Sequence, residues 1–97
     1  MPPVILEARD VIDDGRYLQE VRISTFPPSP ELSEGIRYSL CLVDLESGEV
    51  ALLYDVHRGK SHHRHLRGAE TSYNFVDEDT LLADFFRDMA LILEGKL

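Results

Sequence analysis

The segment that decides the interpretation of this chain is Tyr54-Asp55-Val56-His57-Arg58-Gly59-Lys60-Ser61-His62-His63-Arg64-His65-Leu66-Arg67. It contains all four histidines and four of the ten Lys and Arg residues of a 97-residue chain with a net charge of −8. Outside residues 57–67, six Lys and Arg residues remain against all eighteen Asp and Glu residues. An acidic chain that gathers its cationic and titratable side chains in one short segment is expected to use them, so we predict a site there.

The segment is expected to form a hairpin. Residues 50–57 and 62–67 have the composition of strands, and Arg58-Gly59-Lys60-Ser61 between them is typical of a turn. Successive side chains of a strand point to opposite faces. This alternation places His63, His65 and Arg67 on one side of the sheet, and His62 and Arg64 on the other.

Asp55 and His57 share one face of the first strand of this hairpin. Either side chain can therefore lie across from His63 or His65, because cross-strand Cβ atoms are roughly 4.5–5.5 Å apart. An aspartate beside an imidazole orients the ring and stabilises its charged form.

These side chains are the ones needed to cleave a phosphodiester bond in RNA. A base removes the proton of the 2′-OH, an acid protonates the leaving oxygen, and cations stabilise the charge on the phosphate. The matching activity would be that of a metal-independent endoribonuclease without a cofactor, with His63 and His65 as the acid/base pair. The predicted catalytic residues are Asp55, His63, His65 and Arg64, and the predicted substrate-binding residues are Lys60, Arg58, Arg67, His57, His62 and Tyr73.

Three other interpretations stay open. His62, His63 and His65 could bind a metal ion in a regulator, although no acidic or thiolate residue falls at a recognised ligand spacing. The segment could be an electrostatic patch of a binding module that contacts a protein or a nucleic acid and breaks no bond. Tyr54, Tyr73 and Phe75 could stack on bases, but aromatic residues on half-buried strands more often belong to the core.

The rest of the chain predicts an α+β fold, an antiparallel β-meander of about five to six strands with one C-terminal helix packed on one face. We expect one domain over residues 1–97, with the sheet in 3–76 and the helix in 78–94. Asp13-Asp14-Gly15 and Glu46-Ser47-Gly48-Glu49 are typical of turns, and Gly68–Ser72 is expected to be a loop. The predicted strands are Val4–Ala8, Tyr17–Phe26, Ile36–Leu45, Val50–His57 and His62–Arg67, with Tyr73–Val76 as a last short strand or an aromatic plug.

The C-terminal helix has clear end signals. Asp77 or Asp79 can cap its start and Gly95 closes its end. Its apolar residues fall on two adjacent rows, and one face of the sheet is the only large surface that can bury them. The rows are Leu81, Phe85, Met89 and Leu93, and Leu82, Phe86 and Ala90.

Composition places the chain among globular proteins, with 43% hydrophobic and 29% charged residues. Its apolar runs are too short to span a bilayer and its first residues lack the pattern of a signal peptide, so we expect a cytoplasmic protein without membrane contact. The single cysteine, Cys41, is interpreted as a small core residue.

The chain resembles the TumE-like family of small bacterial and archaeal proteins. The similar residues are Tyr54-Asp55-x-His57-x-Gly59-Lys60-x-His62-His63-Arg64-His65, then Glu70, Tyr73-x-Phe75 and the helical run Leu81-Leu82-Ala83-Asp84-Phe85. The resemblance implies the toxin of a two-gene toxin–antitoxin module, a cognate antitoxin of the helix-turn-helix type encoded nearby, and an action on RNA or translation. Independently, the exposed edges of a small meander allow a homodimer by edge pairing.

Overall fold

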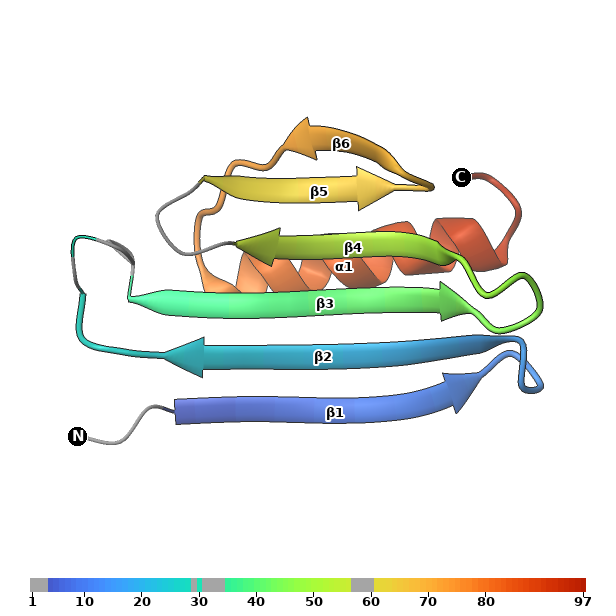
Figure 1. The fold of residues 1–97 in the computed structure, drawn as a ribbon, viewed down its shortest axis with the longest axis horizontal. Coiled ribbons are helices and arrows are strands. Elements are labelled where there is room, and N and C mark those ends of the chain that lie inside the picture. Colours follow the sequence, from blue (N-terminus) through green and yellow to red (C-terminus); the bar gives the residue numbers. More distant parts are fainter. Residues whose placement is uncertain (1–3, 29, 31–34, 57–60) are drawn as a thin grey trace.

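A computed structural model describes residues 4–28, 30, 35–56 and 61–97 of the chain. Within them, six strands form one antiparallel sheet in sequence order, and a helix follows (Figure 1). This architecture confirms the predicted meander with a C-terminal helix. The elements are β1 (Val4–Ile12), β2 (Tyr17–Thr25), β3 (Ile36–Asp44), β4 (Val50–Val56), β5 (His62–Leu66), β6 (Ala69–Ser72) and α1 (Glu78–Leu93).

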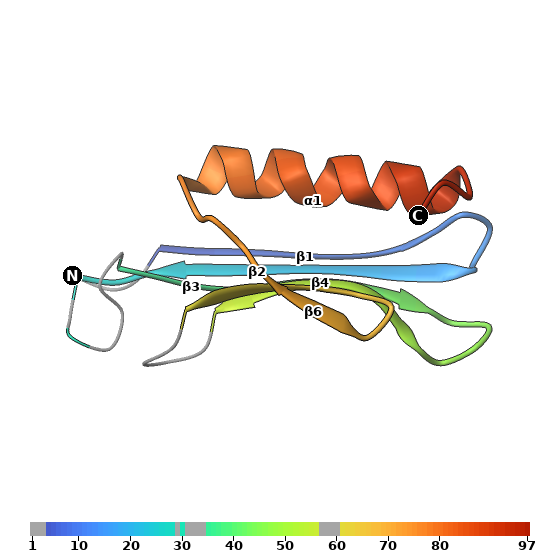
Figure 2. The same cartoon turned by 90° about the horizontal axis from the view of Figure 1, so that it is seen from above.

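The sheet has one covered face and one open face. Helix α1 lies across one side of the sheet and leaves the other side bare, as Figure 2 shows. Side chains that point toward the helix form the core, and those that point away form the surface that we call the open face. The fully buried side chains of the core are Leu40, Leu42, Leu52, Tyr54, Leu81 and Phe85.

Short turns join the first four strands in two pairs, as the sequence predicts. Asp13, Asp14 and Gly15 all have positive φ, the left-handed conformation that tight hairpins require and that Asp and Gly tolerate best. In the turn after β3, Asp44 Oδ1 accepts a hydrogen bond from the backbone N–H of Glu46 at 2.9 Å. Both turns fix the register of the strands that they connect.

Helix α1 begins at the predicted cap. The Asp77 side chain accepts a hydrogen bond from the backbone N–H of Thr80 at 2.7 Å, and Gly95 follows the helix with positive φ. The buried stripe differs from the predicted rows and consists of Leu81, Phe85, Asp88 and Ile92. Phe86 and Leu93 are exposed, because neither lies on the i, i+4, i+7 stripe that faces the sheet, whereas Leu82 and Met89 pack against the core and are half-buried.

Three strand predictions were wrong in detail. The chain pairs as β6 at Ala69–Ser72, where a loop was expected. Of the two alternatives left open for Tyr73–Val76, the aromatic plug applies, because these residues form no strand and Tyr73 and Phe75 pack against the core. Strand β1 extends four residues beyond its predicted end at Ala8. Val50 is exposed, because a register shift between Leu42 and Val43 breaks the alternation at the start of β4.

No helix in the part of the chain that the structure describes is long and apolar enough to cross a membrane.

Candidate functional site

The pairing of β4 with β5 divides the predicted site residues between the two faces of the sheet. Tyr54 pairs with Arg64 on the covered face, and Asp55 pairs with His63 on the open face. His65 follows His63 on the open face, opposite Leu53 of β4 and Glu70 of β6. The predicted alternation is therefore correct for Tyr54 and Asp55 of β4 and for His63, Arg64 and His65 of β5.

Asp55, His63, His65 and Glu70 meet on the open face, and we call them the histidine cluster. The two imidazole rings have centroids 6.4 Å apart. Glu70 lies between them, with Oε1 at 3.2 Å from His63 Nδ1 and at 3.7 Å from His65 Nε2. Asp55 Oδ1 approaches His65 Nε2 to 3.5 Å from the other side.

The histidine cluster is partly open to solvent. The side chains of His63 and His65 are 22% and 26% exposed, whereas that of Asp55 is only 11% exposed. Nδ1 of His63 faces Glu70, and its Nε2 lies 3.4 Å from the hydroxyl of Ser61. Two imidazoles can donate and accept protons, and the neighbouring carboxylates can orient their rings.

Arg64 lies on the covered face and holds the helix. Its Nε donates a hydrogen bond to Asp88 Oδ2 at 2.8 Å, and the Tyr54 hydroxyl donates to the same oxygen. Burial raises the pKa of Tyr54 to about 12, and the bond to Asp88 adds to that effect. Burial alone would raise the pKa of Asp88, but hydrogen bonds from Tyr54 and Arg64 outweigh it, so the pKa of Asp88 lies below its ordinary value.

Besides Arg64, which was predicted to be catalytic, two of the predicted substrate-binding residues pack toward the helix side. His62 stacks on Phe75 with ring centroids 4.8 Å apart, and its Nδ1 lies 2.8 Å from the Tyr38 hydroxyl. Tyr73 donates a hydrogen bond from its hydroxyl to Asp84 Oδ2 at 2.6 Å. These contacts stabilise the fold and turn both side chains away from the histidine cluster.

Arg67 does not share the face of His63 and His65, contrary to the prediction. It lies in the turn after β5 with positive φ, where strand alternation has ended, and its Nη2 donates to the carbonyl of Leu97 at 3.1 Å. His57, Arg58 and Lys60 lie outside the described residues.

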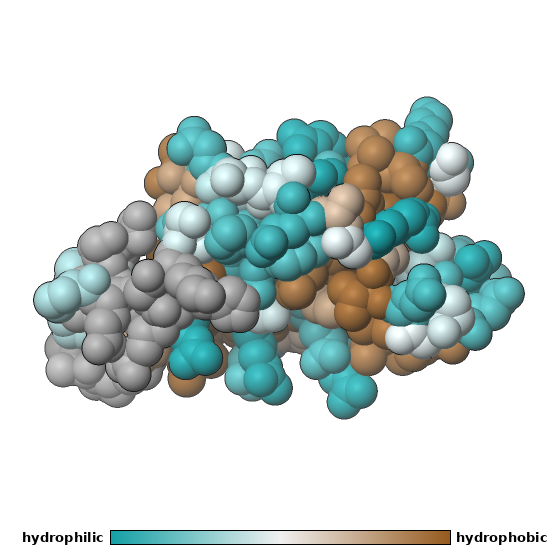
Figure 3. Space-filling view, turned by 45° about the horizontal axis from the view of Figure 1, so that its top comes forward, coloured by the Kyte–Doolittle hydropathy of each residue, from teal (hydrophilic) through white to brown (hydrophobic). Residues whose placement is uncertain are grey.

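Two arginines that sequence reasoning passed over lie on the open face. Arg22 of β2 pairs with Ser39 of β3, and Ser39 pairs in turn with Asp55, so one row of side chains leads from Arg22 to the histidine cluster. A shallow hollow in this face includes Arg22, Ser24, Arg37 and Ser39 among its lining residues. The space-filling view from the β6 side shows hydrophilic side chains across much of the middle of that surface (Figure 3).

Comparison with known proteins shows how the chain is related to other proteins. The model of the family described as Toxin TumE matches residues 3–93, nearly the whole chain. The chain belongs to the TumE toxin family. No curated protein and no solved structure matched it.

Within this TumE-family chain, Glu70 is a cluster residue that the sequence-based site assignment missed. A loop was predicted around it, and only the pairing of His65 with Glu70 in β6 brings its carboxylate between the imidazoles. The sequence signal that could have identified Glu70 was its presence among the residues that resemble the TumE-like family.

The other reactive candidates in the described part of this TumE chain are groups of metal ligands and the thiol of Cys41. Among those residues, no three His, Cys, Asp or Glu side chains are arranged to hold a metal ion. Burial, and then the negative charge of Glu20, raise the pKa of the Cys41 thiol, which makes it a poor nucleophile.

Proposed function

We propose that this member of the TumE toxin family acts on RNA at the open face of its sheet, with His63 and His65 as the acid/base pair. The observation that supports this proposal is the histidine cluster itself. Two imidazoles from one strand stand side by side, flanked by carboxylates, on the face that the helix leaves uncovered.

The proposed reaction is transfer of the phosphodiester to the neighbouring 2′ oxygen. The neutral imidazole removes the proton of the 2′-OH as this oxygen attacks phosphorus. The protonated imidazole then gives its proton to the departing 5′ oxygen, so the bond to that oxygen breaks and the imidazoles have exchanged states. Each ring nitrogen acts on an oxygen that lies roughly 2.6–3.2 Å away, and both oxygens belong to the same phosphodiester.

The carboxylates have positioning roles in this proposal. Glu70 Oε1 lies within 3.2 Å of His63 Nδ1, which leaves the opposite nitrogen of that ring directed away from the carboxylate. Asp55, whose Oδ1 lies 3.5 Å from His65 Nε2, orients the ring of that histidine.

The phosphate backbone is proposed to lie along the row toward Arg22 and Arg37. One guanidinium group can donate hydrogen bonds to two phosphate oxygens at once. The hollow lined by these two arginines is also lined by Ser39, which pairs with Asp55. Lys60 and Arg58 stay in the proposed binding set from the sequence. Arg64 is left out, because it is bonded to Asp88 on the covered face.

A toxin of this family has a cognate antitoxin. We propose an antitoxin of the helix-turn-helix type encoded beside the gene, and a cytoplasmic site of action, as the resemblance and the composition suggest. Expression of the gene alone and together with its neighbour, followed by growth, tests the pairing. Growth arrest that the neighbour fails to relieve would contradict it.

The catalytic proposal is tested with purified protein and ribosome-bound or structured RNA in the presence of EDTA. We expect cleavage by the wild type and a loss of at least about 100-fold in rate for His63→Ala and for His65→Ala, a typical loss for general acid or base catalysis. Because the acid/base pair requires no metal, EDTA should leave the rate unchanged.

His62→Asn is the matched control, because it replaces a histidine of the same strand on the covered face and keeps a polar atom where Nδ1 lies. It should retain cleavage if circular dichroism shows a folded protein. Intact RNA with every variant, together with salt-sensitive RNA binding, would instead favour the non-catalytic binding module.

A further inference from the structure

Strand β1 is a long edge with an unusual pattern of side chains. It is nine residues long, pairs with β2 along its whole length without a bulge, and forms one end of the sheet (Figure 1). Ile5, Leu6 and Val11 are 58%, 47% and 62% exposed. Proteins usually protect such edges with bulges, prolines or very short strands, because the unpaired backbone groups bind other strands.

The opposite edge lacks these properties. Strand β6 has four residues, Ala69–Ser72, all exposed and mostly polar. A short polar strand offers few backbone hydrogen bonds and little apolar surface. Of the two edges in the described sheet, β1 is therefore the one suited to pairing.

The order of residues in β1 is self-complementary about Ala8. If two copies pair antiparallel with Ala8 opposite Ala8, then Ile5 faces Val11, Leu6 faces Asp10 and Glu7 faces Arg9. Each of these contacts occurs twice. The pair of Ile5 and Val11 is apolar and the pair of Glu7 and Arg9 has opposite charges, and cross-strand pairs of both kinds stabilise a sheet.

Neighbouring registers are disfavoured by charge. A shift of the partner strand by one residue would exchange its faces, so the permitted shifts are of two residues. Such a shift places Glu7 opposite Glu7 in one direction and Arg9 opposite Arg9 in the other, and like charges directly opposite destabilise the pair. Only the register centred on Ala8 joins these charges in opposite pairs.

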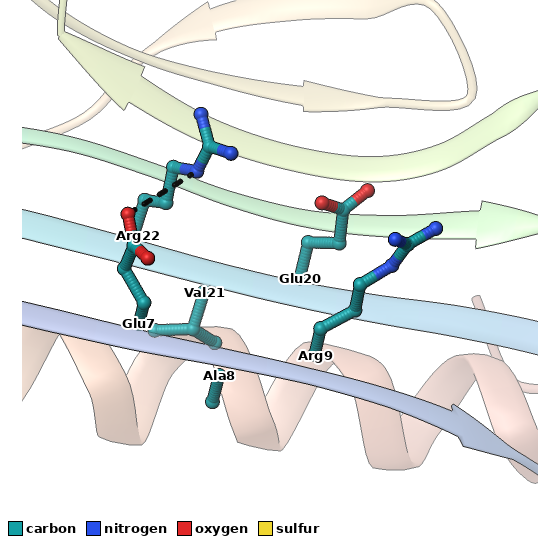
Figure 4. A pocket seen from close by; sticks show the side chains of 6 residues that line it. All are labelled: Glu7, Ala8, Arg9, Glu20, Val21 and Arg22. Carbon is teal, nitrogen blue, oxygen red and sulfur yellow. Dashed lines mark ion pairs between the residues drawn. The ribbon is translucent and has the colours of Figure 1, made fainter.

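The charges of β2 extend the same pattern. Glu7 forms an ion pair with Arg22 at 3.8 Å, and Arg9 pairs with Glu20 in the register of β1 and β2. Figure 4 shows these four side chains together on the open face. In the paired dimer, each row across the junction would alternate in sign as Arg22, Glu7, then Arg9 and Glu20 of the second copy.

From this pattern we infer that the chain forms a homodimer through antiparallel pairing of β1 with β1 of a second copy, in the register centred on Ala8. The occupant of the edge is thus another molecule of the same protein. The two sheets join as one of twelve strands, with both helices on one side and both histidine clusters on the other. The clusters lie roughly 40 Å apart at about 4.8 Å per strand. The inference is independent of the proposed chemistry.

Charge exchange across the junction is the first test. Glu7→Arg places arginine opposite arginine at both symmetric contacts, and Arg9→Glu places glutamate opposite glutamate. Each variant alone should weaken the dimer about tenfold or more in sedimentation equilibrium. An equimolar mixture of the two variants pairs opposite charges at both contacts again, and it should recover the dimer.

Arg37→Glu is the control for these variants, because it changes a charge of the same face on β3, two strands from the edge, and should leave the dimer largely intact. A wild type that sediments as a monomer up to millimolar concentration would overturn the inference. So would a dimer that resists both single substitutions.

Disulfide trapping tests the register even if a charge variant fails to fold. Facing Cα atoms in an antiparallel pair are roughly 4.5–5.5 Å apart, within the range for a disulfide. In a Cys41→Ser background, Ala8→Cys should therefore crosslink two chains under mild oxidation. Asp10→Cys, on the same face of the same strand, should not, because two copies of residue 10 would be roughly 13 Å apart. Equal crosslinking by both variants would refute the register.

Discussion

At the scale of single residues, Asp88 connects the helix to the strand that carries the histidines. It is 3% exposed, and it accepts hydrogen bonds from Arg64 of β5 and Tyr54 of β4. A buried carboxylate is costly unless it is paired, and this one has a guanidinium partner. The contact fixes the covered side of β5, and through the alternation of the strand it fixes the position of His63 and His65.

Asp88→Asn should lower the free energy of unfolding by roughly 1.5–3 kcal/mol at neutral pH, the range for hydrogen bonds to charged groups. The pKa of Asp88 is lowered in the folded chain, so its contribution is present above the unfolded value of 3.8 and is lost as pH falls through the folded value. The difference between wild type and variant should therefore narrow below about pH 4.

Urea unfolding at a series of pH values measures this difference. Asp79→Asn, which changes an acidic residue at the exposed start of the helix, is the control and should change stability little. A difference in unfolding free energy between wild type and Asp88→Asn that stays constant into the acid range would contradict the role assigned to the charge of Asp88.

At the scale of elements, helix α1 covers the hydrophobic core on one face of the sheet (Figure 2). Phe85 is fully buried and meets the ring of Tyr54 edge to face, with centroids 6.0 Å apart. Phe86, the next residue, is 40% exposed. These two adjacent phenylalanines therefore differ in burial because successive side chains point in different directions around the helix axis, and only Phe85 points toward the sheet.

Phe85→Ala should cost about 3–5 kcal/mol of unfolding free energy, because it leaves a cavity between helix and sheet. Phe86→Ala should cost much less, since its ring already contacts water. Thermal and urea denaturation of the two variants provide the comparison. Equal losses would mean that the helix lies in a different rotation on the sheet.

At the scale of the whole molecule, the net charge of −8 opposes RNA at long range. The proposed RNA binding would then rely on local cations, and Arg22 and Arg37 on the open face are among the described candidates. Each contact between a cation and a phosphate releases condensed counterions, which makes affinity depend on salt.

The affinity for a single-stranded RNA should therefore fall with salt. Combined Arg22→Gln and Arg37→Gln should flatten the plot of log affinity against log salt by about 1.4, at roughly 0.7 per phosphate contact. Lys96→Gln, near the C-terminus, is the control and should not change the slope. An unchanged slope in the double variant would remove the two arginines from the binding surface.

Local pattern predicted the meander, the first two turns and the cap of the helix well. The alternation of side chains was also enough to assign His63 and His65 to one face of the sheet and His62 and Arg64 to the other. Strand β6 was not predicted, because all four of its residues are exposed and an edge strand without a buried side carries no alternation.

Contacts between distant elements could not be predicted in the same way. The bond from Arg64 to Asp88 depends on where the helix crosses the sheet, which its periodicity does not specify. The convergence of Arg22 and Ser39 toward Asp55 depends on the register of three strands at once. Tyr73 has an aromatic ring suitable for a base, but its contacts with Asp84 of the helix and with the ring of Tyr54 direct it inward.

The division of β5 between two faces has an evolutionary consequence. Loss or gain of one residue inside this strand would exchange the sides, sending His63 and His65 beneath the helix and lifting His62 and Arg64 to the surface. Lineages that keep a working protein should therefore vary in length between strands, and should accept changes within β5 only where a compensating bulge restores the original orientation.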